Sequence, residues 1–445
     1  MSTLVVHDVE LDGTAGFDVL IRDGRIAEVG SALTTPRRSE VIDGRGGVLI
    51  PGLHDHHIHL HALAADRASV RCGPPHVHTV DDLAAALNAA SGDDWIRGVG
   101  YFESVAGMLD SQALDRLHST RPVRIQHRSG ALWILNSTAA ALVGLDTADH
   151  PGVERDDAGR PTGRVWRADT WLRDRLPDTG PPPLDALGTE LAGYGITGLT
   201  DATPDLSPSS LTALIDAHTS GAVPQRLHLL GAPNGFTSAD PAVTVGPYKI
   251  VLADSGLPDL DVLTETIRST HAAGRAVAVH CVSREAFAIL LAVFTEVGAH
   301  PGDRIEHGAL VPAESITDLH RLGLRVVTQP GFLADRGDSY LQEVDPRDVG
   351  DLYRCRSLLD SVVPLALSSD APYGPLDPWQ IVEAAVTRTA ASGAVVGASE
   401  RLDPAEAIAG FLSAADDPGG RSRTVAPGGR ADVVLLDRPL ADALA

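Results

Sequence analysis

Short apolar segments that end in polar residues recur eight times between residues 52 and 372 of this 445-residue chain. Stretches of helical character separate them, most often at intervals of 20–40 residues. Near-continuous apolar strands that alternate with helices predict a parallel sheet covered on both faces. Eight is the strand number of a (β/α)8 TIM barrel, in which chemistry collects at the carboxyl ends of the strands. The segments are 52–60, 195–202, 226–232, 248–254, 276–282, 304–310, 325–330 and 364–372.

The interval between the first and second segments is too long for one crossover connection. We therefore expect an inserted subdomain, about residues 61–194, within a barrel domain that spans 53–419. Its Pro-rich stretch at 176–185 would return the chain to the barrel.

The two ends of the chain have a different character from the middle. Short β-rich pieces fill the first fifty residues, and Asp23-Gly24 between Val/Ile-rich flanks is a hairpin signal that indicates an antiparallel unit. Residues 427–437 read as one more strand of this kind. We predict a small composite β-sandwich domain formed from both termini, residues 1–52 and 420–445.

Composition excludes several classes of partner. The formal charge is −23 and the basic residues form no cluster, which argues against nucleic acid and against an anionic membrane surface. Three cysteines at unrelated spacings suggest no disulfide framework. The N-terminus lacks the pattern of a signal peptide, and the longest apolar run, 286–294, is too short to span a bilayer. We expect a cytoplasmic protein with a small-molecule substrate, and a homodimer as the commonest default.

Potential metal ligands stand at the polar ends of several segments. His57 and His59 are two residues apart, so in a strand their side chains point the same way and can bind one metal ion. His280, His307 and Asp370 end three later segments. Nitrogen and oxygen ligands suit zinc, or alternatively iron, manganese or nickel. A lone strand-end histidine is more often a satisfied polar group, and Asp370 alone would be taken for a helix N-cap, but their joint placement favours a metal centre.

Lys249 is the only lysine among 36 basic residues, and it stands in the fourth segment between Tyr248 and Ile250. Desolvation by apolar neighbours lowers the pKa of a lysine amine and makes it nucleophilic. A neutral amine can add carbon dioxide and become a carbamate, an anionic oxygen ligand able to bridge two metal ions. Guanidinium cannot do this, so we predict a carbamylated Lys249.

The motif PGLHDHHIHL at 51–60 resembles the first metal motif of the amidohydrolase superfamily, Pro-Gly-aromatic-x-Asp-x-His-x-His. Lys249 and the strand-end residues fall where that superfamily has its carboxylated lysine, further histidine ligands and catalytic aspartate. Longer pieces are similar to the branch of N-substituted formamide deformylases and YtcJ-like proteins, and the likeness covers essentially the whole chain. These pieces are DDWIRGVGYFE (93–103), RPVRIQHRSGALWILNS (121–137), GRPTGRV (159–165), GPYKIVLAD (246–254) and VPLALSSDAPYGPLDPW (363–379).

The resemblance implies a hydrolase with one or two divalent ions, most simply Zn²⁺. In such a site a metal lowers the pKa of water toward ~7 and polarises a carbonyl. The implied ligands of the deeper ion are His57, His59 and Asp370, with His280 and His307 on the outer ion and carbamylated Lys249 between them. Asp370 would act as general base and then as general acid. Arg128 in the insert and Gln329 at the end of the seventh segment are predicted substrate contacts.

The chain departs from that branch at three places that bear on substrate. Ser129-Gly130 is followed by Ala131 where the branch has histidine. After the histidine of the fifth segment the branch tends to have small residues and an aspartate, but this chain reads His280-Cys281-Val282-Ser283. The acidic residue that follows Lys249, Asp254, lies one place later than is typical. We expect cleavage of the C–N bond of an amide, such as an N-formyl or N-acyl compound. The alternatives are a cyclic amide, carbamate or ester as substrate, or a barrel that binds metal or ligand without turnover.

Overall fold

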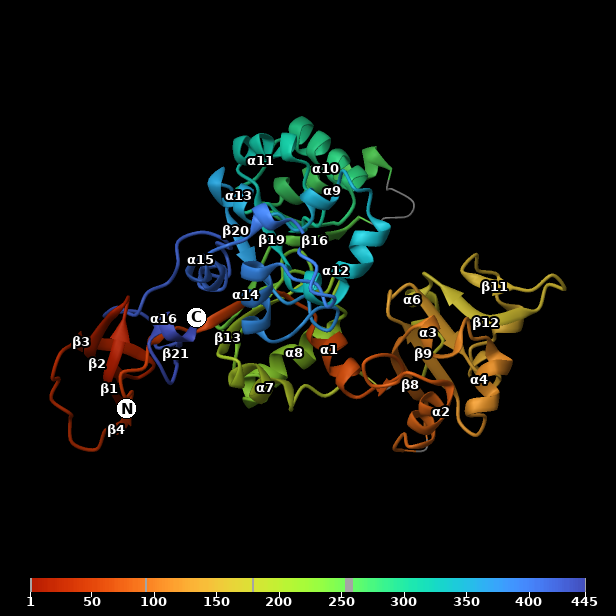
Figure 1. Ribbon diagram of the computed structural model, residues 1–445, viewed down its shortest axis with the longest axis horizontal. Helices are drawn as coiled ribbons and strands as arrows, with labels where there is room; N and C mark the ends of the chain where they lie inside the picture. The colour runs from red at the N-terminus through yellow and green to blue at the C-terminus, as the bar shows by residue number, and fades with distance from the viewer. Residues whose placement is uncertain (1, 93, 178–179, 253–258, 445) are drawn as a thin grey trace. The chain divides into compact units, whose positions relative to one another are not determined.

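The computed structural model describes residues 2–92, 94–177, 180–252 and 259–444. Its contacts divide the chain into two compact units, Leu63–Pro182 and the combination of Met1–Ala62 with Pro183–Ala445. Each unit has its own β-structure (Figure 1) and its own hydrophobic clusters. Within the described ranges, no helix combines the length and the apolar character needed to cross a membrane.

The N-terminal sheet has the strand order β3-β2-β1-β4. β1 (Thr3–Leu11), β2 (Thr14–Arg22) and β3 (Arg25–Gly30) are antiparallel neighbours. The β2–β3 turn is the predicted Asp23-Gly24 pair, and both residues have the positive φ that this two-residue turn requires. β4 (Glu40–Asp43) runs parallel to β1, so the prediction of a wholly antiparallel unit is wrong at this pairing. The connection before β4 is long enough to cross the hairpin and return the chain in the direction of β1.

The two ends of the chain meet in a separate pairing. β21 (Val433–Leu435) runs antiparallel to β5 (Leu49–Pro51). Leu49 belongs to the same buried cluster as apolar residues of β1 and β2. Partly buried residues near the C-terminus pack against this cluster. These C-terminal residues are Val425, Ala431, Val433 and Leu435.

Each of the eight apolar segments contains one β-strand, and the strands pair in parallel. They form a four-stranded sheet β15-β14-β13-β6 and a five-stranded sheet β16-β17-β18-β19-β20, where β15 (Val243–Val245) is an additional strand that the sequence did not predict. The predicted strands are β6 (Leu53–Ile58), β13 (Ile196–Asp201), β14 (Arg226–Leu229), β16 (Tyr248–Val251), β17 (Val277–Cys281), β18 (Arg304–His307), β19 (Arg325–Thr328) and β20 (Leu365–Leu367).

Helices follow these strands in chain order. α9, α10 and α11 come after β16, β17 and β18, and they pack against one another on one side of the strands in Figure 1. N-cap Ser283 accepts from the backbone of Ala286 and starts α10, whose buried face carries five apolar residues. The main helices are α7 (Leu187–Gly193), α8 (Pro208–Ser220), α9 (Leu260–Ala272), α10 (Arg284–Val297), α11 (Ile316–Leu322), α12 (Gly331–Glu343), α14 (Pro378–Thr387) and α15 (Pro404–Ala409).

The unit Leu63–Pro182 lies within the range expected for the insertion. It contains a six-stranded mixed sheet of order β11-β12-β10-β9-β8-β7 and two hydrophobic clusters of its own. Its strands are β7 (Val70–Arg71), β8 (Ile96–Tyr101), β9 (Val123–His127), β10 (Leu132–Leu135), β11 (Val153–Arg155) and β12 (Pro161–Trp166). Its α-helices are α2 (Val80–Asn88), α3 (Glu103–Ala106), α4 (Ser111–Leu117), α5 (Ser137–Leu142) and α6 (Asp169–Arg173).

Asp55 fastens β6 to the segment after β20. Its Oδ1 accepts from the backbone nitrogens of His57 and Ser369, both at 3.1 Å, and its Oδ2 accepts from the Ser369 hydroxyl. The Asp370 nitrogen also donates to the carbonyl of His57 at 2.8 Å. All these groups are buried, so the carboxylate holds two backbones together where water cannot replace it.

Replacing Asp55 by Ala should lower the free energy of unfolding by about 2–4 kcal/mol, because two buried backbone N–H groups lose their acceptor. Asp55→Asn keeps one acceptor oxygen and should lose less. Urea unfolding followed by circular dichroism measures both, with the exposed Asp442→Ala as a control near zero. An Asp55→Ala protein within about 0.5 kcal/mol of the parent would contradict the role of Asp55 as a fastening group.

Candidate metal centre

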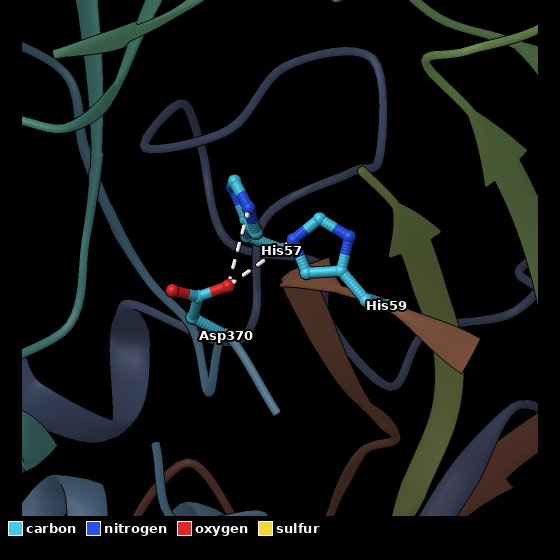
Figure 2. Close-up of side chains that lie close together, drawn as sticks. All are labelled: His57, His59 and Asp370. Atoms are coloured by element: carbon cyan, nitrogen blue, oxygen red, sulfur yellow. Dashed lines mark ion pairs between the residues drawn. The ribbon is translucent and has the colours of Figure 1, made fainter. Parts of the chain in front are cut away.

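Three side chains from the carboxyl ends of β6 and β20 converge in the structure (Figure 2). The Nε2 atoms of His57 and His59 lie 3.5 and 3.3 Å from the same oxygen, Asp370 Oδ1. One ligand atom from each residue lies within 4.8 Å of the others. Among the residues that the structure describes, this is the one group of three or more His, Cys, Asp or Glu side chains close enough to hold a metal ion.

Two further predicted ligands border this group. His307 ends β18, with its Nδ1 3.7 Å from Asp370 Oδ2 and its ring centroid 4.8 Å from that of His57. The ring of His280, in β17, lies 4.4 Å from that of His307. β17 and β18 are parallel neighbours in which His280 is opposite Glu306, the residue before His307, and the two rings meet edge to face. His307 thus lies directly beside the cluster, and His280 lies next to His307.

The predicted pKa shift of Lys249 is present. The side chain, on β16, is only 3% exposed, and its Nζ has no hydrogen-bond partner among the described residues. Burial lowers the pKa of Lys249 to about 8, against the opposing attraction of Glu306 and Asp370. An amine in this range has an appreciable neutral, nucleophilic fraction near neutral pH.

Burial also disfavours the protonated form of three of these histidines. It lowers the pKa of His57 and His307 well below the usual value and the pKa of His280 to about 4, with the Lys249 charge as a further cause in each case. Neutral imidazole is the form that binds metals, so the desolvation that would oppose protonation favours ligation.

The backbone is unusual at two of the predicted ligands. His307 has φ 69° and Asp370 has φ 52°, both in the left-handed region that non-glycine residues rarely adopt. Residues held in such conformations cluster at functional sites, because the surrounding structure must stabilise them. At Asp370 that support includes the hydrogen bond from its nitrogen to the carbonyl of His57.

Gln329 lies next to a predicted ligand. Its Oε1 is 2.9 Å from His307 Nδ1, and its Nε2 donates to Ser368 Oγ at 2.9 Å. The amide is fully buried and orients the imidazole of His307. Its contact with substrate stays a prediction.

The sequence linked two other residues to substrate, Arg128 and Asp254. Arg128 belongs to the unit Leu63–Pro182, where its guanidinium stacks on the ring of Phe102, 3.4 Å from the centroid. Its role toward substrate therefore remains a prediction. Asp254 lies outside the described residues.

His54 and His56 behave as the packing groups that the alternation of β6 predicts. Their ring centroids lie 4.6 Å apart. His54 Nε2 pairs with Thr200 Oγ1 at 2.9 Å and His56 Nε2 with Ser413 Oγ at 3.1 Å, so both rings are engaged away from the metal cluster.

Sequence reasoning missed two buried charged residues beside the centre. Glu306, directly before His307, contacts His57 Nδ1 through one oxygen and the Arg304 guanidinium through the other. Neither Glu306 nor Arg304 is exposed at all. The available signal was an opposite-charge pair two residues apart in a short buried strand, since such residues share a face and are almost never buried unpaired.

The donor atoms of the cluster fit a divalent metal. Two of them, His57 Nε2 and Asp370 Oδ1, are buried without a hydrogen-bond partner in the described part of the chain, and so is the Nζ of Lys249 outside the cluster. Each buried polar atom of this kind is costly unless a group outside the polypeptide binds it. Imidazole nitrogen and carboxylate oxygen are ligands that zinc and similar ions prefer.

Comparison with known proteins agrees with this geometry. The sequence model of the amidohydrolase family matches residues 40–445. The chain belongs to the amidohydrolase family. It is therefore an enzyme of the class that hydrolyses carbon–nitrogen bonds other than peptide bonds.

Individual relatives are distant but cover nearly the whole chain. An N-substituted formamide deformylase of Arthrobacter pascens is 25% identical over 98% of this chain and 93% of its own length. The amidohydrolase YtcJ of Bacillus subtilis, whose assignment is itself provisional, is 25% identical over 88% of this chain and 84% of its own. The crystal structure of an uncharacterized metal-dependent hydrolase from Pyrococcus horikoshii matches with a TM-score of 0.80 at 21% identity, covering 98% of both chains. The predicted resemblance to this branch is confirmed, and the structural match supports the α/β fold.

The lowered pKa of Lys249 makes a prediction about stability in metal-free, bicarbonate-free buffer. Because the folded pKa is about 8 and the ordinary value is 10.5, the unfolded state binds more protons between these pH values, and stability rises with pH there. Below pH ~8 the buried charge costs about 3 kcal/mol. Lys249→Met should therefore be more stable than the parent at pH 7, and the difference should shrink as the pH approaches 10.5. Urea unfolding at a series of pH values measures it, and a pH-independent difference would contradict the shift.

Proposed function

We propose that this chain is a metal-dependent hydrolase that cleaves the C–N bond of a small-molecule amide, with an N-formyl or N-acyl amine as substrate. The observation that carries the proposal is the convergence of His57, His59 and Asp370, whose ligand atoms His57 Nε2 and Asp370 Oδ1 are buried and have no hydrogen-bond partner in the described part of the chain. The amidohydrolase family and the deformylase relative support the choice of reaction.

The fold proposed for this activity is a closed (β/α)8 barrel, residues 53–419, with an insertion at about 61–194. Two hydrogen bonds between the two groups of parallel strands support closure. Asp370 N, just after β20, donates to His57 O on β6, and Lys249 N on β16 donates to the carbonyl of Leu230, directly after β14, at 3.4 Å. The β5–β21 pairing supports a composite β-sandwich from residues 1–52 and 420–445.

The residues of this chain divide the work as follows. His57, His59 and Asp370 would hold one ion, and His280 and His307 a second. A divalent ion such as Zn²⁺ supplies Lewis acidity, which lowers the pKa of water and polarises the scissile carbonyl. Asp370 would accept the proton of the attacking water at a carboxylate oxygen and transfer it to the leaving nitrogen.

Lys249 would bind carbon dioxide before it binds metal. Its neutral amine forms a bond to the carbon of CO2 and loses one proton to solvent, which leaves an anionic carbamate with two oxygen donors. The buried Nζ without a hydrogen-bond partner supports this assignment, because an amine tied up in hydrogen bonds would be a poorer nucleophile.

Turnover of a substrate panel tests the proposed function directly. Protein with measured metal content is assayed on N-formyl amines, N-acyl amines, cyclic amides and esters, before and after chelation and after return of Zn²⁺, Mn²⁺, Fe²⁺ or Ni²⁺. We expect amide turnover that is lost on chelation and restored by metal. Full activity of metal-free protein would refute the mechanism, and turnover of cyclic amides or esters alone would refute the substrate class.

Replacing Lys249 by Arg keeps a positive charge but prevents carbamate formation. Metal content should fall, and kcat/KM should drop by about 100-fold or more, because the lost metal supplies several kcal/mol of transition-state stabilisation. Lys249→Ala should be equally inactive but partly rescued by formate or acetate, which can occupy the vacated space. Near-normal turnover by Lys249→Arg would make the lysine a structural residue.

Asp370→Asn separates acid–base chemistry from metal binding. Asparagine has almost the same shape and can still offer an oxygen, but it cannot accept the proton of water. The variant should keep its fold and most of its metal while kcat falls by about 10²–10⁴-fold. Steady-state kinetics with parallel metal analysis measures it, and a loss of less than a few-fold, with chemistry rate-limiting, would remove Asp370 from its proposed role.

A further inference from the structure

A buried chain of charged and polar groups ends at His57. The Arg304 Nε donates to Glu306 Oε1, and Glu306 Oε2 contacts His57 Nδ1. All three residues have no exposed surface. Arg304 Nη2 also donates to the carbonyl of His56 at 3.1 Å, so the guanidinium is anchored on β6 as well as on β18.

Glu306 is not itself placed to hold a metal ion. Its two oxygens face two different partners, one on Arg304 and one on His57. It also stands outside the group formed by His57, His59 and Asp370, which is the one candidate metal cluster in the described residues. The carboxylate therefore acts on the centre through His57.

The contact between Glu306 and His57 Nδ1 determines which nitrogen of His57 has a lone pair available for a metal ion. A neutral imidazole has one N–H and one lone pair, and the proton resides on the nitrogen that has an acceptor. The Glu306 carboxylate is an acceptor at Nδ1, whereas Nε2 has no hydrogen-bond partner and lies 3.5 Å from Asp370 Oδ1. The lone pair thus points from Nε2 into the cluster that Figure 2 shows.

We propose that Glu306, held by Arg304, is a positioning residue that fixes His57 in the Nδ1–H tautomer and directs Nε2 at the metal. This inference rests on the proposed function, because it assigns His57 a metal to bind. Carboxylates that accept from a ligating histidine raise its basicity and restrict its rotation, and their loss lowers metal affinity by about 10- to 100-fold.

A second buried pair provides a matched control for the loss of a charge. Glu400, 1% exposed, accepts from Arg354 Nη1 at 2.6 Å and from the backbone nitrogens of Cys355 and Ser357. Like Glu306 it is a buried carboxylate paired with an arginine, but it contacts none of the predicted ligands. A general effect of removing a buried carboxylate should appear in both variants.

The experiment compares Zn²⁺ affinity of the parent, Glu306→Gln and Glu400→Gln by competition with a chromophoric chelator. Thermal unfolding of the metal-free proteins is measured in parallel. We expect a 10- to 100-fold weaker affinity for Glu306→Gln and less than a 3-fold change for Glu400→Gln, although both lose stability without metal. Glutamine offers one acceptor for the two donors that Glu306 serves, so it cannot satisfy Arg304 and His57 together.

The outcomes distinguish this inference from the function on which it rests. A parent protein that binds no Zn²⁺ overturns the proposed function and the inference with it. A parent that binds Zn²⁺ while Glu306→Gln binds equally well overturns the inference alone. Equal weakening in both variants also overturns it, because the effect then belongs to stability.

A measurement on the unsubstituted protein covers the case in which Glu306→Gln does not fold. Nitrogen-15 NMR of histidine-labelled, metal-free parent reports the tautomer of each imidazole, and comparison with His57→Asn identifies the signal of His57. We expect the Nδ1–H form. An Nε2–H form at His57 would overturn the proposal.

Discussion

Buried nitrogen and oxygen atoms that lack hydrogen-bond partners constrain this structure more than any single contact. His57 Nε2, Asp370 Oδ1 and Lys249 Nζ come from three strands or strand ends, and none of them has a hydrogen-bond partner within the described residues. In a folded protein each such atom would cost about 1–3 kcal/mol. A bound ion would satisfy the nitrogen of His57 and the oxygen of Asp370 as ligands, and it would be consistent with the buried, unbonded amine of Lys249 nearby.

The polypeptide supports these atoms with groups that are themselves fully engaged. Asp55 links β6 to the segment that carries Asp370. Asp370 has a left-handed backbone conformation, which the surrounding structure must stabilise. Gln329 contacts Nδ1 of His307, and Glu306 contacts Nδ1 of His57. These hydrogen bonds restrict the positions of the His57, His307 and Asp370 side chains.

Much of this arrangement could be predicted from the sequence, since all eight apolar segments contain a strand and the strand-end histidines meet Asp370. Strand periodicity and residue chemistry are local signals. The parallel direction of β4 was missed because pairing direction depends on how a connection crosses the sheet. The extra strand β15 was missed because it has only three residues, too few for a periodic pattern. Arg304 and Glu306 were missed for a related reason. Their spacing in a short buried strand marks them as a buried ion pair, but the contact of Glu306 with His57, 249 residues away along the chain, is not visible in any local pattern.

Diffraction from crystals soaked in Zn²⁺, recorded on both sides of the zinc absorption edge, would test the central claim most directly. The account predicts an anomalous peak about 2.0–2.2 Å from the Nε2 atoms of His57 and His59 and from a carboxylate oxygen of Asp370. Absence of a peak there from fully loaded, active protein, or a peak at a different set of residues, would contradict it.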